Sequence, residues 1–284
     1  MPGNGSPDLP ERQRLREARR LRGGPGAMTR SRRANPKLYR REVRVSGYPI
    51  RYRTAGVGEP LVLLHGLSGS SDWWRRNVPA LARRYQVFLL DLPGFGAMRR
   101  ERRRFSLAEA AAWLFSWMEA VGLERISLVG HSMGGYVGIK LAAEHPETVD
   151  RLALVAPAGT TGRRSMIGYL PPLLLAAYRS TPSFFPMFAY DTLRMGPSTL
   201  WRASREILAG DVSEELSRIS TPTLLVWGAQ DPLVPPTAGK LMRSQMPYSR
   251  LVVIEDTGHV PMFDRPEEFN EKLLSFLAGG AVGD

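Results

Sequence analysis

The chain has 284 residues and a formal net charge of +12, and 43% of its residues are hydrophobic. A chain of this length can bury one large core, so we expect one domain that carries an insertion. The absence of cysteine excludes disulfides, thiolate metal sites and a cysteine nucleophile, and it fits a reducing compartment. Neither a signal-like apolar segment nor a run of about 18 apolar residues is found, so we predict a cytoplasmic protein without a transmembrane segment.

The positive charge is concentrated at the N-terminus. Residues 1–41 hold 12 Lys or Arg against three acidic residues, which is +9 of the total and leaves +3 for the rest. Because this segment has few apolar residues, it cannot offset the entropy of ordering, and we predict a basic disordered tail over residues 1–41. The tail either binds an anionic partner, such as nucleic acid or a lipid surface, or is a solvated extension. For the nearly neutral globular part we expect no specific nucleic-acid partner.

Two kinds of strand pattern follow the tail. Residues 43–54 alternate apolar and polar side chains around a Ser-Gly-Tyr-Pro turn, which predicts an antiparallel hairpin. Later runs that are apolar at nearly every position cover residues 61–64, 87–90, 126–129, 152–155, 224–227 and 251–254. Runs that are apolar on both faces are typical of a parallel sheet covered by helices on both sides.

Helical stretches lie between these runs. The clearest covers residues 106–121, where Ser106 and Glu109 have the spacing of a capping box. Two more are predicted over residues 133–144 and, with a proline in the first turn, over residues 266–277. Strands that alternate with helices through right-handed crossovers predict the fold class α/β, with a doubly wound, mostly parallel sheet.

One interval interrupts this alternation. Residues 158–219 contain no parallel-strand run and are rich in Met, Phe, Tyr, Leu and Pro. A structureless loop of that length is not expected inside a compact domain. We therefore predict a small helical cap over residues 158–219, inserted between the core segments 42–157 and 220–284.

The strongest chemical signal is a G-x-S-x-G sequence. Residues 130–134 read Gly-His-Ser-Met-Gly, directly after one strand run and at the start of the 133–144 helix. Between a strand and a helix, glycines allow the sharp turn that projects a strained serine above the sheet. We predict Ser132 as a nucleophile; the alternative is a glycine-rich turn in which the serine only caps the helix.

A serine hydroxyl becomes an effective nucleophile when a base within about 3 Å removes its proton. The chain has four histidines. His131 adjoins Ser132 and should point elsewhere, whereas His145 ends a helix before a proline. His65 lies in a loop where we expect a structural hydrogen bond. His259, just after the last strand run, is therefore the predicted general base.

The base requires a carboxylate on its other ring nitrogen, which fixes the tautomer and stabilises the imidazolium. Asp231 leaves the end of the 224–227 strand on the same edge of the sheet and is the predicted acid, although it could instead be a turn aspartate before a proline. Asp256 competes with it, but its place three residues before His259 favours a role in shaping the loop. The backbone N–H groups of Leu67 and Met133 are the predicted oxyanion hole.

In the order Ser132, Asp231, His259, the chain resembles the α/β-hydrolase family over residues 43–277. His65-Gly66 resembles its oxyanion loop, and the acid and base loops have counterparts at Asp231 and His259. The resemblance implies an α/β-hydrolase fold and a serine hydrolase of the carboxylesterase or lipase-like branch. Dehalogenases and epoxide hydrolases of the family use an aspartate nucleophile, which Ser132 argues against. Carbon–carbon bond hydrolases often carry asparagine where this chain has His131, which favours esterases.

Much apolar surface lies in the predicted cap. If part of it faces the pocket, lipophilic substrates are favoured; otherwise these residues only bury the cap on the core. The residues are Met166, Ile167, Tyr169, Leu170, Leu173, Leu174, Leu175, Tyr178, Phe184, Phe185, Met187, Phe188, Tyr190, Met195 and Trp201.

The predicted activity is hydrolysis of carboxylic esters with lipophilic, short-to-medium acyl chains through an acyl-enzyme, so the expected partner is a small lipophilic ester. A carbon–carbon bond hydrolase or perhydrolase on the same residues is one alternative, and a non-catalytic small-ligand-binding protein is another. No cofactor is expected, because Gly94-Phe95-Gly96 lacks the third glycine of a dinucleotide motif and no metal-ligand spacing appears. Residues 99–104, five arginines and a glutamate, either attract anions or form a solvated loop, and we place them outside the site.

Overall fold

The computed structural model of the protein describes residues 36–100, 106–159, 171–172, 175–176 and 180–280. These residues belong to one compact unit that begins at Pro36. Residues 1–35 of the predicted tail lie outside the described residues, and so do residues 160–170 of the predicted cap. In the described part of the chain, no helix combines the length and the apolar character that a membrane span requires.

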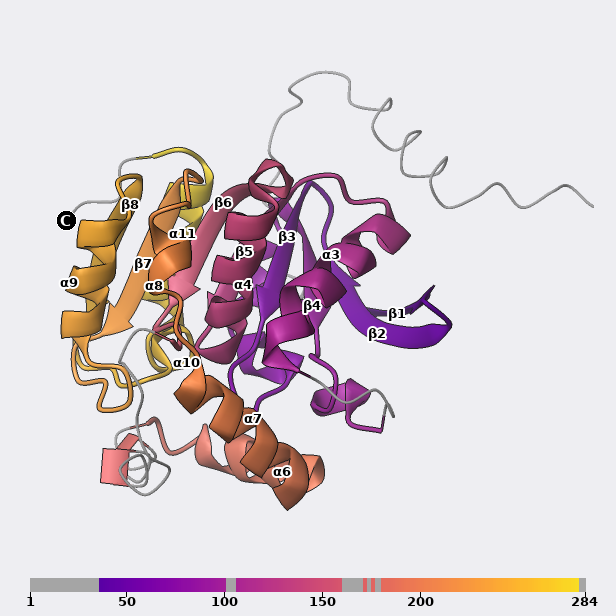
Figure 1. Cartoon of the computed structure of the whole chain (residues 1–284), viewed down its shortest axis with the longest axis horizontal. Helices are drawn as coiled ribbons and strands as arrows, with labels where there is room; N and C mark the ends of the chain where they lie inside the picture. The colour runs from indigo at the N-terminus through magenta and orange to yellow at the C-terminus, as the bar shows by residue number, and fades with distance from the viewer. Residues whose placement is uncertain (1–35, 101–105, 160–170, 173–174, 177–179, 281–284) are drawn as a thin grey trace, which may run out of the picture. The chain divides into compact units, whose positions relative to one another are not determined.

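One eight-stranded sheet organises the fold (Figure 1). Its strands in chain order are β1 (Tyr39–Val45), β2 (Tyr48–Ala55), β3 (Glu59–Leu64), β4 (Tyr85–Leu90), β5 (Ile126–His131), β6 (Val149–Val155), β7 (Thr223–Gly228) and β8 (Ser249–Ile254). Their order across the sheet is β1-β2-β4-β3-β5-β6-β7-β8. The hairpin β1–β2 pairs antiparallel with β4, and every later neighbouring pair is parallel. Each of the six apolar runs lies in one of the strands β3 to β8, which confirms the predicted α/β class.

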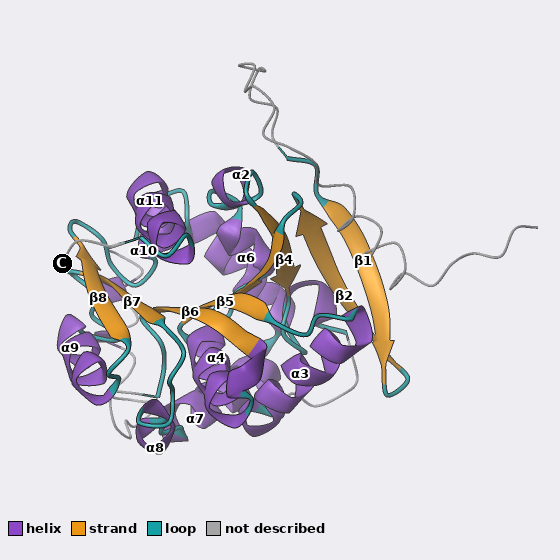
Figure 2. Ribbon diagram, turned by 90° about the horizontal axis from the view of Figure 1, so that it is seen from above, coloured by secondary structure: helices purple, strands orange, loops and turns teal. Residues whose placement is uncertain are grey.

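Helices cover both faces of this sheet (Figure 2). They are α2 (Val78–Leu81), α3 (Ala110–Val121), α4 (Met133–Glu144), α6 (Phe185–Met195), α7 (Pro197–Ala209), α8 (Ser213–Leu216), α9 (Pro236–Gln245), α10 (Pro261–Asp264) and α11 (Pro266–Leu277). Short 3₁₀ turns lie at Ser71–Trp74, Gly96–Met98, Leu107–Glu109 and Pro146–Thr148. Seen along the sheet, α3, α4 and α9 lie on one face, whereas α2 and α11 lie on the other.

Strand β3 shows why its sequence is apolar throughout. Leu61 and Leu63 pack into the core that contains α11 residues, whereas Val62 and Leu64 pack into the core that contains α3 residues. All four side chains are fully buried. Burial of a side chain of this size contributes about 1.5–3 kcal/mol, so a polar residue at any of these positions would be costly on either face.

Two sequence-based expectations were wrong in detail. β1 begins at Tyr39, inside the predicted tail, because residues from Tyr39 onward pair in register with β2, starting at Thr54. The capping box does not form: the Ser106 side chain makes no capping bond, and Leu107 begins a 3₁₀ turn. The Leu107 N–H instead donates to the carboxylate of Glu206 in α7. A tertiary contact thus replaces the local cap, and α3 starts only at Ala110.

The described residues between β6 and β7 form α6, α7 and α8 and contain no strand. Polar contacts attach this region to the rest of the fold. Besides the Glu206 contact, Lys140 of α4 bonds the Glu215 carboxylate of α8 at 2.6 Å, and the Thr181 hydroxyl donates to Asp264 at 2.6 Å. We refer to the helices between β6 and β7 as the cap helices; the domain boundaries at 157, 158, 219 and 220 remain predictions.

Candidate active site

The predicted site residues lie at the carboxyl ends of parallel strands. Leu67 follows β3, Ser132 follows β5, Asp231 follows β7 and His259 follows β8. Because these strands are parallel, their carboxyl ends meet at one edge of the sheet. Ligands of open α/β sheets bind at that edge.

Ser132 sits on a strained turn between β5 and α4. Its φ of 50° and ψ of −110° are unusual for a residue with a side chain, and such a conformation costs about 1–3 kcal/mol. The turn is held by a bond from the Ser132 N–H to Val155 of β6, at 2.9 Å, and by one from the Gly134 N–H to His65, at 3.1 Å. A Cβ on Gly134 would lie 2.7 Å from the Leu64 carbonyl oxygen, so only glycine lets the helix approach β3 this closely.

Asp231 and His259 are joined by a direct hydrogen bond. The His259 Nδ1–H donates to Asp231 Oδ2 at 2.7 Å, and both residues are buried. The other carboxylate oxygen of Asp231 accepts from the N–H groups of Leu233 and Val234, at 2.9 and 3.1 Å. The Asp231 carboxylate is thereby fixed on both oxygens. Because Nδ1 of His259 carries the donated proton, Nε2 of the neutral ring has a lone pair and can accept one.

The acid and base loops also hold each other. The Gln230 N–H donates to Thr257, and the Thr257 hydroxyl donates to the Ile254 carbonyl at 2.8 Å. Asp256, the competing acid, has a side chain that is 71% exposed and accepts from Arg265 at 3.1 Å. Its φ of 55° places it in the turn of the base loop. This geometry favours Asp231 as the partner of His259 and gives Asp256 a place in the loop.

His131, next to Ser132, contacts the base loop. Its Nε2 is 2.8 Å from the backbone carbonyl oxygen of His259, and since a carbonyl only accepts, Nε2 carries the proton. Burial lowers the pKa of His131 well below its usual value, and the nearby His259 lowers it further. The ring therefore stays neutral and holds the loop that carries His259. Sequence reasoning placed His131 away from the chemistry and missed this contact.

His65 has the structural role that its position predicts. Its Nδ1–H donates to the Gly66 carbonyl at 2.8 Å, and its Nε2 accepts from the Leu92 N–H at 3.1 Å. Both ring nitrogens are thus used in linking two strand-end loops, and burial lowers the pKa of the ring. This arrangement excludes His65 as the base for Ser132 in the described conformation.

The two predicted oxyanion donors lie close to the turn that carries Ser132. A turn closed by the Gly69 N–H and the Gly66 carbonyl, at 3.0 Å, contains Leu67, whose own N–H is not used by that bond. Met133 is the first residue of α4, where an N–H has no acceptor within the helix. The bond from Gly134 to His65 ties the two segments together. The N–H groups of Leu67 and Met133 therefore remain the predicted donors to a ligand oxygen beside Ser132.

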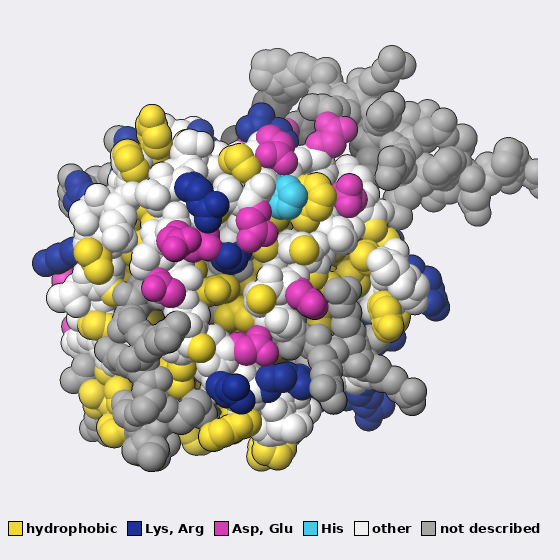
Figure 3. All heavy atoms as spheres, viewed as in Figure 1, with side chains coloured by type: hydrophobic (Ala, Val, Ile, Leu, Met, Phe, Trp, Pro, Cys, Tyr) yellow, Lys and Arg dark blue, Asp and Glu magenta, His cyan; other side chains and the backbone are white. Residues whose placement is uncertain are grey.

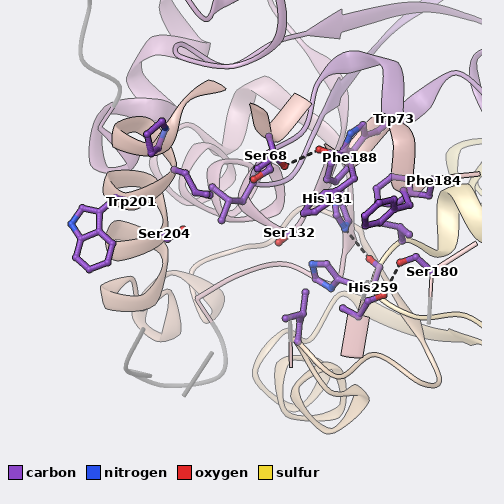
Figure 4. A pocket seen from close by; sticks show the side chains of 18 residues that line it. Ser68, Trp73, His131, Ser132, Ser180, Phe184, Phe188, Trp201, Ser204 and His259 are labelled. Carbon is purple, nitrogen blue, oxygen red and sulfur yellow. Dashed lines mark hydrogen bonds between the residues drawn. The ribbon is translucent and has the colours of Figure 1, made fainter. Parts of the chain in front are cut away.

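Ser132 and His259 line a common pocket of about 420 Å³ (Figure 4). In this view Trp201 and Ser204 lie on one side of Ser132, and an aromatic group lies on the other side. In that group, the ring of Trp73 lies 4.8 Å from that of Phe184 and 6.3 Å from that of Phe188. The remaining lining residues are Leu67, Ser68, His131, Ala176, Ser180, Phe185, Thr192, Pro197, Leu200, Leu233 and Val260.

The prediction that cap residues face a pocket is met by four of the residues named for it, which are Phe184, Phe185, Phe188 and Trp201. Met195 instead packs into the core that contains α3 residues, and Met187 packs against the core that contains α11 residues. Tyr190 is exposed. The residues of that group that lie outside the described ones are Met166, Ile167, Tyr169, Leu170, Leu173, Leu174 and Tyr178.

Sequence reasoning missed Asp191 of α6. Its buried carboxylate accepts from the Ser70 hydroxyl at 2.8 Å and from the Trp73 indole N–H at 3.1 Å. Burial raises the pKa of Asp191, and the bonds from Ser70 and Trp73 partly offset that shift. The residue joins a cap helix to the loop that carries Leu67. An isolated aspartate within the apolar sequence of α6 was the available signal.

The other candidates lie away from this pocket. The ring of His145 stacks on Phe115 with centroids 4.0 Å apart. Arg99 donates to the Gly96 carbonyl at 3.3 Å, and residues 101–105 lie outside the described residues.

The sequence pattern of the Alpha/beta hydrolase family matches residues 61–272, from β3 into α11. The chain belongs to the α/β-hydrolase family. This membership agrees with the strand order and with the position of the serine turn between β5 and α4.

Relatives of this α/β-hydrolase include enzymes of more than one specificity. A pimeloyl-[acyl-carrier protein] methyl ester esterase of Aeromonas hydrophila is 32% identical, over 78% of this chain and 96% of the relative. A 2-hydroxy-6-oxo-6-phenylhexa-2,4-dienoate hydrolase of Comamonas testosteroni is 30% identical, over 82% of this chain and 92% of the relative. The crystal structure of a membrane phospholipase A has a TM-score of 0.73 and 29% identity, over 85% of this chain and 86% of that one.

Proposed function

We propose that this α/β-hydrolase is a carboxylesterase that cleaves lipophilic esters with short-to-medium acyl chains. The observation that carries the proposal is the 2.7 Å bond between His259 and Asp231, with His259 and Ser132 lining one pocket. That arrangement fixes the tautomer in which His259 can remove a proton from Ser132. We also retain a cytoplasmic location, because a chain without cysteine fits a reducing compartment.

The proposed reaction has two steps. In the first, Ser132 Oγ attacks the ester carbonyl carbon, and Nε2 of His259 takes the serine proton. The negative charge that develops on the carbonyl oxygen is stabilised by the N–H groups of Leu67 and Met133. The carbon–oxygen ester bond breaks, and His259 gives its proton to the leaving alcohol. In the second step, water transfers a proton to His259 and attacks the acyl carbon. The bond from that carbon to Ser132 Oγ then breaks, His259 returns the proton to Ser132, and the acid leaves.

Two relatives support ester chemistry: the methyl ester esterase at 32% identity and the phospholipase A structure at 29% identity. The dienoate hydrolase at 30% identity supports the second candidate, a carbon–carbon bond hydrolase. Its named substrate is an anion, and no Lys or Arg occurs among the described residues that line the pocket. Against the described lining, desolvation of a carboxylate costs more free energy than desolvation of a neutral ester. We therefore place ester hydrolysis first.

We expect mixing of the protein with excess p-nitrophenyl butyrate to release a burst of nitrophenolate before steady turnover. The burst should approach about one equivalent per chain if deacylation is slower than acylation, because each Ser132 is acylated once before water regenerates it. Stopped-flow absorbance measures the amplitude. Ser132→Ala is the control and should give no burst. A protein that only binds small ligands would show neither burst nor turnover, and turnover of a dienoate without any ester turnover would favour the second candidate.

We expect kcat/KM on p-nitrophenyl esters to rise from acetate to an acyl chain of about four to eight carbons. Each added methylene that leaves water for the aromatic lining is worth about 0.8 kcal/mol, or roughly a fourfold gain, until the pocket is full. Initial rates across a homologous ester series measure the profile. A maximum at acetate with a steady decline would contradict the lipophilic pocket while leaving the assignment of Ser132 untouched.

A further inference from the structure

The outward face of α6 is apolar and uncovered. Leu193 lies eight residues, or about two turns, after Phe185, and Tyr190 lies three residues before Leu193. The i, i+3 and i, i+4 spacings place neighbouring side chains on the same side of a helix. Their exposed fractions are 57%, 83% and 57%. The opposite face packs inward through Asp191 and Met195, which are buried. The helix therefore presents to solvent the kind of residues that a helix of a globular protein normally turns toward its core.

This face continues onto α7 and to the mouth of the pocket. Trp201 of α7 is 58% exposed, and α7 directly follows α6 in the chain. Phe185 and Trp201 are exposed and also line the pocket that holds Ser132. The pocket therefore opens between residues of this apolar face. We use the name cap surface for the exposed aromatic, leucine and arginine residues of α6 and α7, which are Phe185, Tyr190, Leu193, Arg194, Trp201 and Arg205.

The charge on the cap surface is positive. Arg194 and Arg205 are exposed, and the Arg194 guanidinium lies 4.7 Å from the centre of the Tyr190 ring. The acidic residues of these two helices are engaged elsewhere: Asp191 bonds Ser70 and Trp73, and Glu206 accepts from the Leu107 N–H. Figure 3 shows hydrophobic and Lys or Arg side chains together at the lower edge of the molecule, where Figure 1 places α6 and α7.

We propose that the cap surface docks on an anionic phospholipid layer. Leu, Phe, Trp and Tyr side chains with flanking arginines are the composition of helices that lie in a lipid interface. The rings and Leu193 would enter the boundary between headgroups and acyl chains, while the arginines would meet lipid phosphates. A second copy of the chain fits less well, since it would bring arginines against arginines with no carboxylate from α6 or α7 to pair with them.

Docking in this orientation places the mouth of the pocket at the lipid. A lipophilic molecule dissolved in the layer could then enter between Phe185 and Trp201 without crossing water. The docking proposal can be tested separately from ester hydrolysis, because none of the residues changed in its test lines the pocket.

Co-sedimentation of the full chain with vesicles tests the proposal. The vesicles contain either phosphatidylglycerol mixed with phosphatidylcholine or phosphatidylcholine alone, at about 0.5 M salt to screen the basic tail. The variant is Leu193→Asp, and the matched control is Val57→Asp. Leu193 and Val57 are equally exposed, at 83% and 82%, but Val57 precedes β3 at the opposite edge of the sheet. Both variants keep the tail, so their difference reports on the cap surface alone.

We expect the wild-type chain and Val57→Asp to bind the phosphatidylglycerol vesicles equally. Leu193→Asp should bind about tenfold more weakly or worse, because a buried leucine contact is lost and a negative charge is introduced. In a second series at about 0.15 M salt, where exposed charges are less screened, Arg194→Glu should weaken binding to these vesicles by about fivefold for each unit of charge changed, with little effect on neutral vesicles. Turnover of a soluble p-nitrophenyl ester should be the same in all four proteins and serves as the check on folding.

Three results would overturn the proposal: no binding of the wild-type chain to phosphatidylglycerol vesicles, equal binding by Leu193→Asp and Val57→Asp, or a dimer in sedimentation that Leu193→Asp dissociates. The last would identify the cap surface as a contact between copies. If the wild-type chain showed no ester turnover, that result would count against the proposed function only, because vesicle binding is measured separately.

Discussion

Replacing Ser132 by alanine should lower kcat on a p-nitrophenyl ester by about 10³- to 10⁶-fold, with little change in KM. The substitution removes the oxygen that forms the covalent bond and leaves the lining of the pocket in place. Alanine meets the same backbone strain at a φ of 50° as serine does, so the turn between β5 and α4 should persist. Thermal unfolding should therefore show a Tm close to that of the wild-type chain.

His259→Ala should cause a loss of similar size, and the double variant should be no worse than either single one. The serine and histidine act as one unit, so removing the second member of a disabled unit has no further effect. Steady-state kinetics on the two single variants and the double variant measure this. Retention by His259→Ala of more than about a tenth of the wild-type kcat would show that another group removes the Ser132 proton.

Much of the fold could be predicted because its strands are buried on both faces. A run such as 61–64 has no polar position, and the structure sends its alternate residues into two different cores. Helices that begin at a sharp local signal were also placed correctly: α4 covers residues 133–144 and α11 covers residues 266–277, as predicted. In both, a turn or proline signal lies in the sequence itself and does not depend on distant contacts.

What could not be predicted depends on contacts between segments far apart in the chain. The capping box at Ser106 competes with a bond from Leu107 to Glu206, which lies 99 residues away. The start of β1 at Tyr39 depends on pairing with β2, since Lys37 to Arg41 are too polar to indicate a strand by themselves. Local propensity gives way where a tertiary partner is available.

The residues of the candidate site also fall into those that the sequence could predict and those that it could not. Ser132, Asp231 and His259 could be proposed because each follows a recognisable strand, and parallel strands bring their carboxyl ends together. Which of the apolar cap residues line the pocket could not be predicted, because the packing of the cap helices decides which side chains face it. A pattern of apolar residues gives the cap its composition but not its orientation.

Asp231→Asn should lower kcat on a p-nitrophenyl ester by about 10⁴-fold. The N–H groups of Leu233 and Val234 both bond one oxygen of Asp231, and His259 bonds the other. In an asparagine, the amide oxygen would keep the two backbone donors, and the NH₂ group would face His259. Nδ1 would then have to accept, so the ring proton would move to Nε2, and the ring could no longer take the proton of Ser132.

Asp256→Asn is the matched control, because it removes the other carboxylate near the base loop by the same change of atoms. Its side chain is exposed and bonds only Arg265 among the contacts described for it, so kcat should stay within about twofold of the wild-type value. Steady-state kinetics of the two variants, with Tm as the check on folding, decide between the carboxylates. If Asp256→Asn lost as much activity as Asp231→Asn, or more, Asp256 would be the acid of this site, and His259 would have to change its hydrogen-bond partner during the reaction.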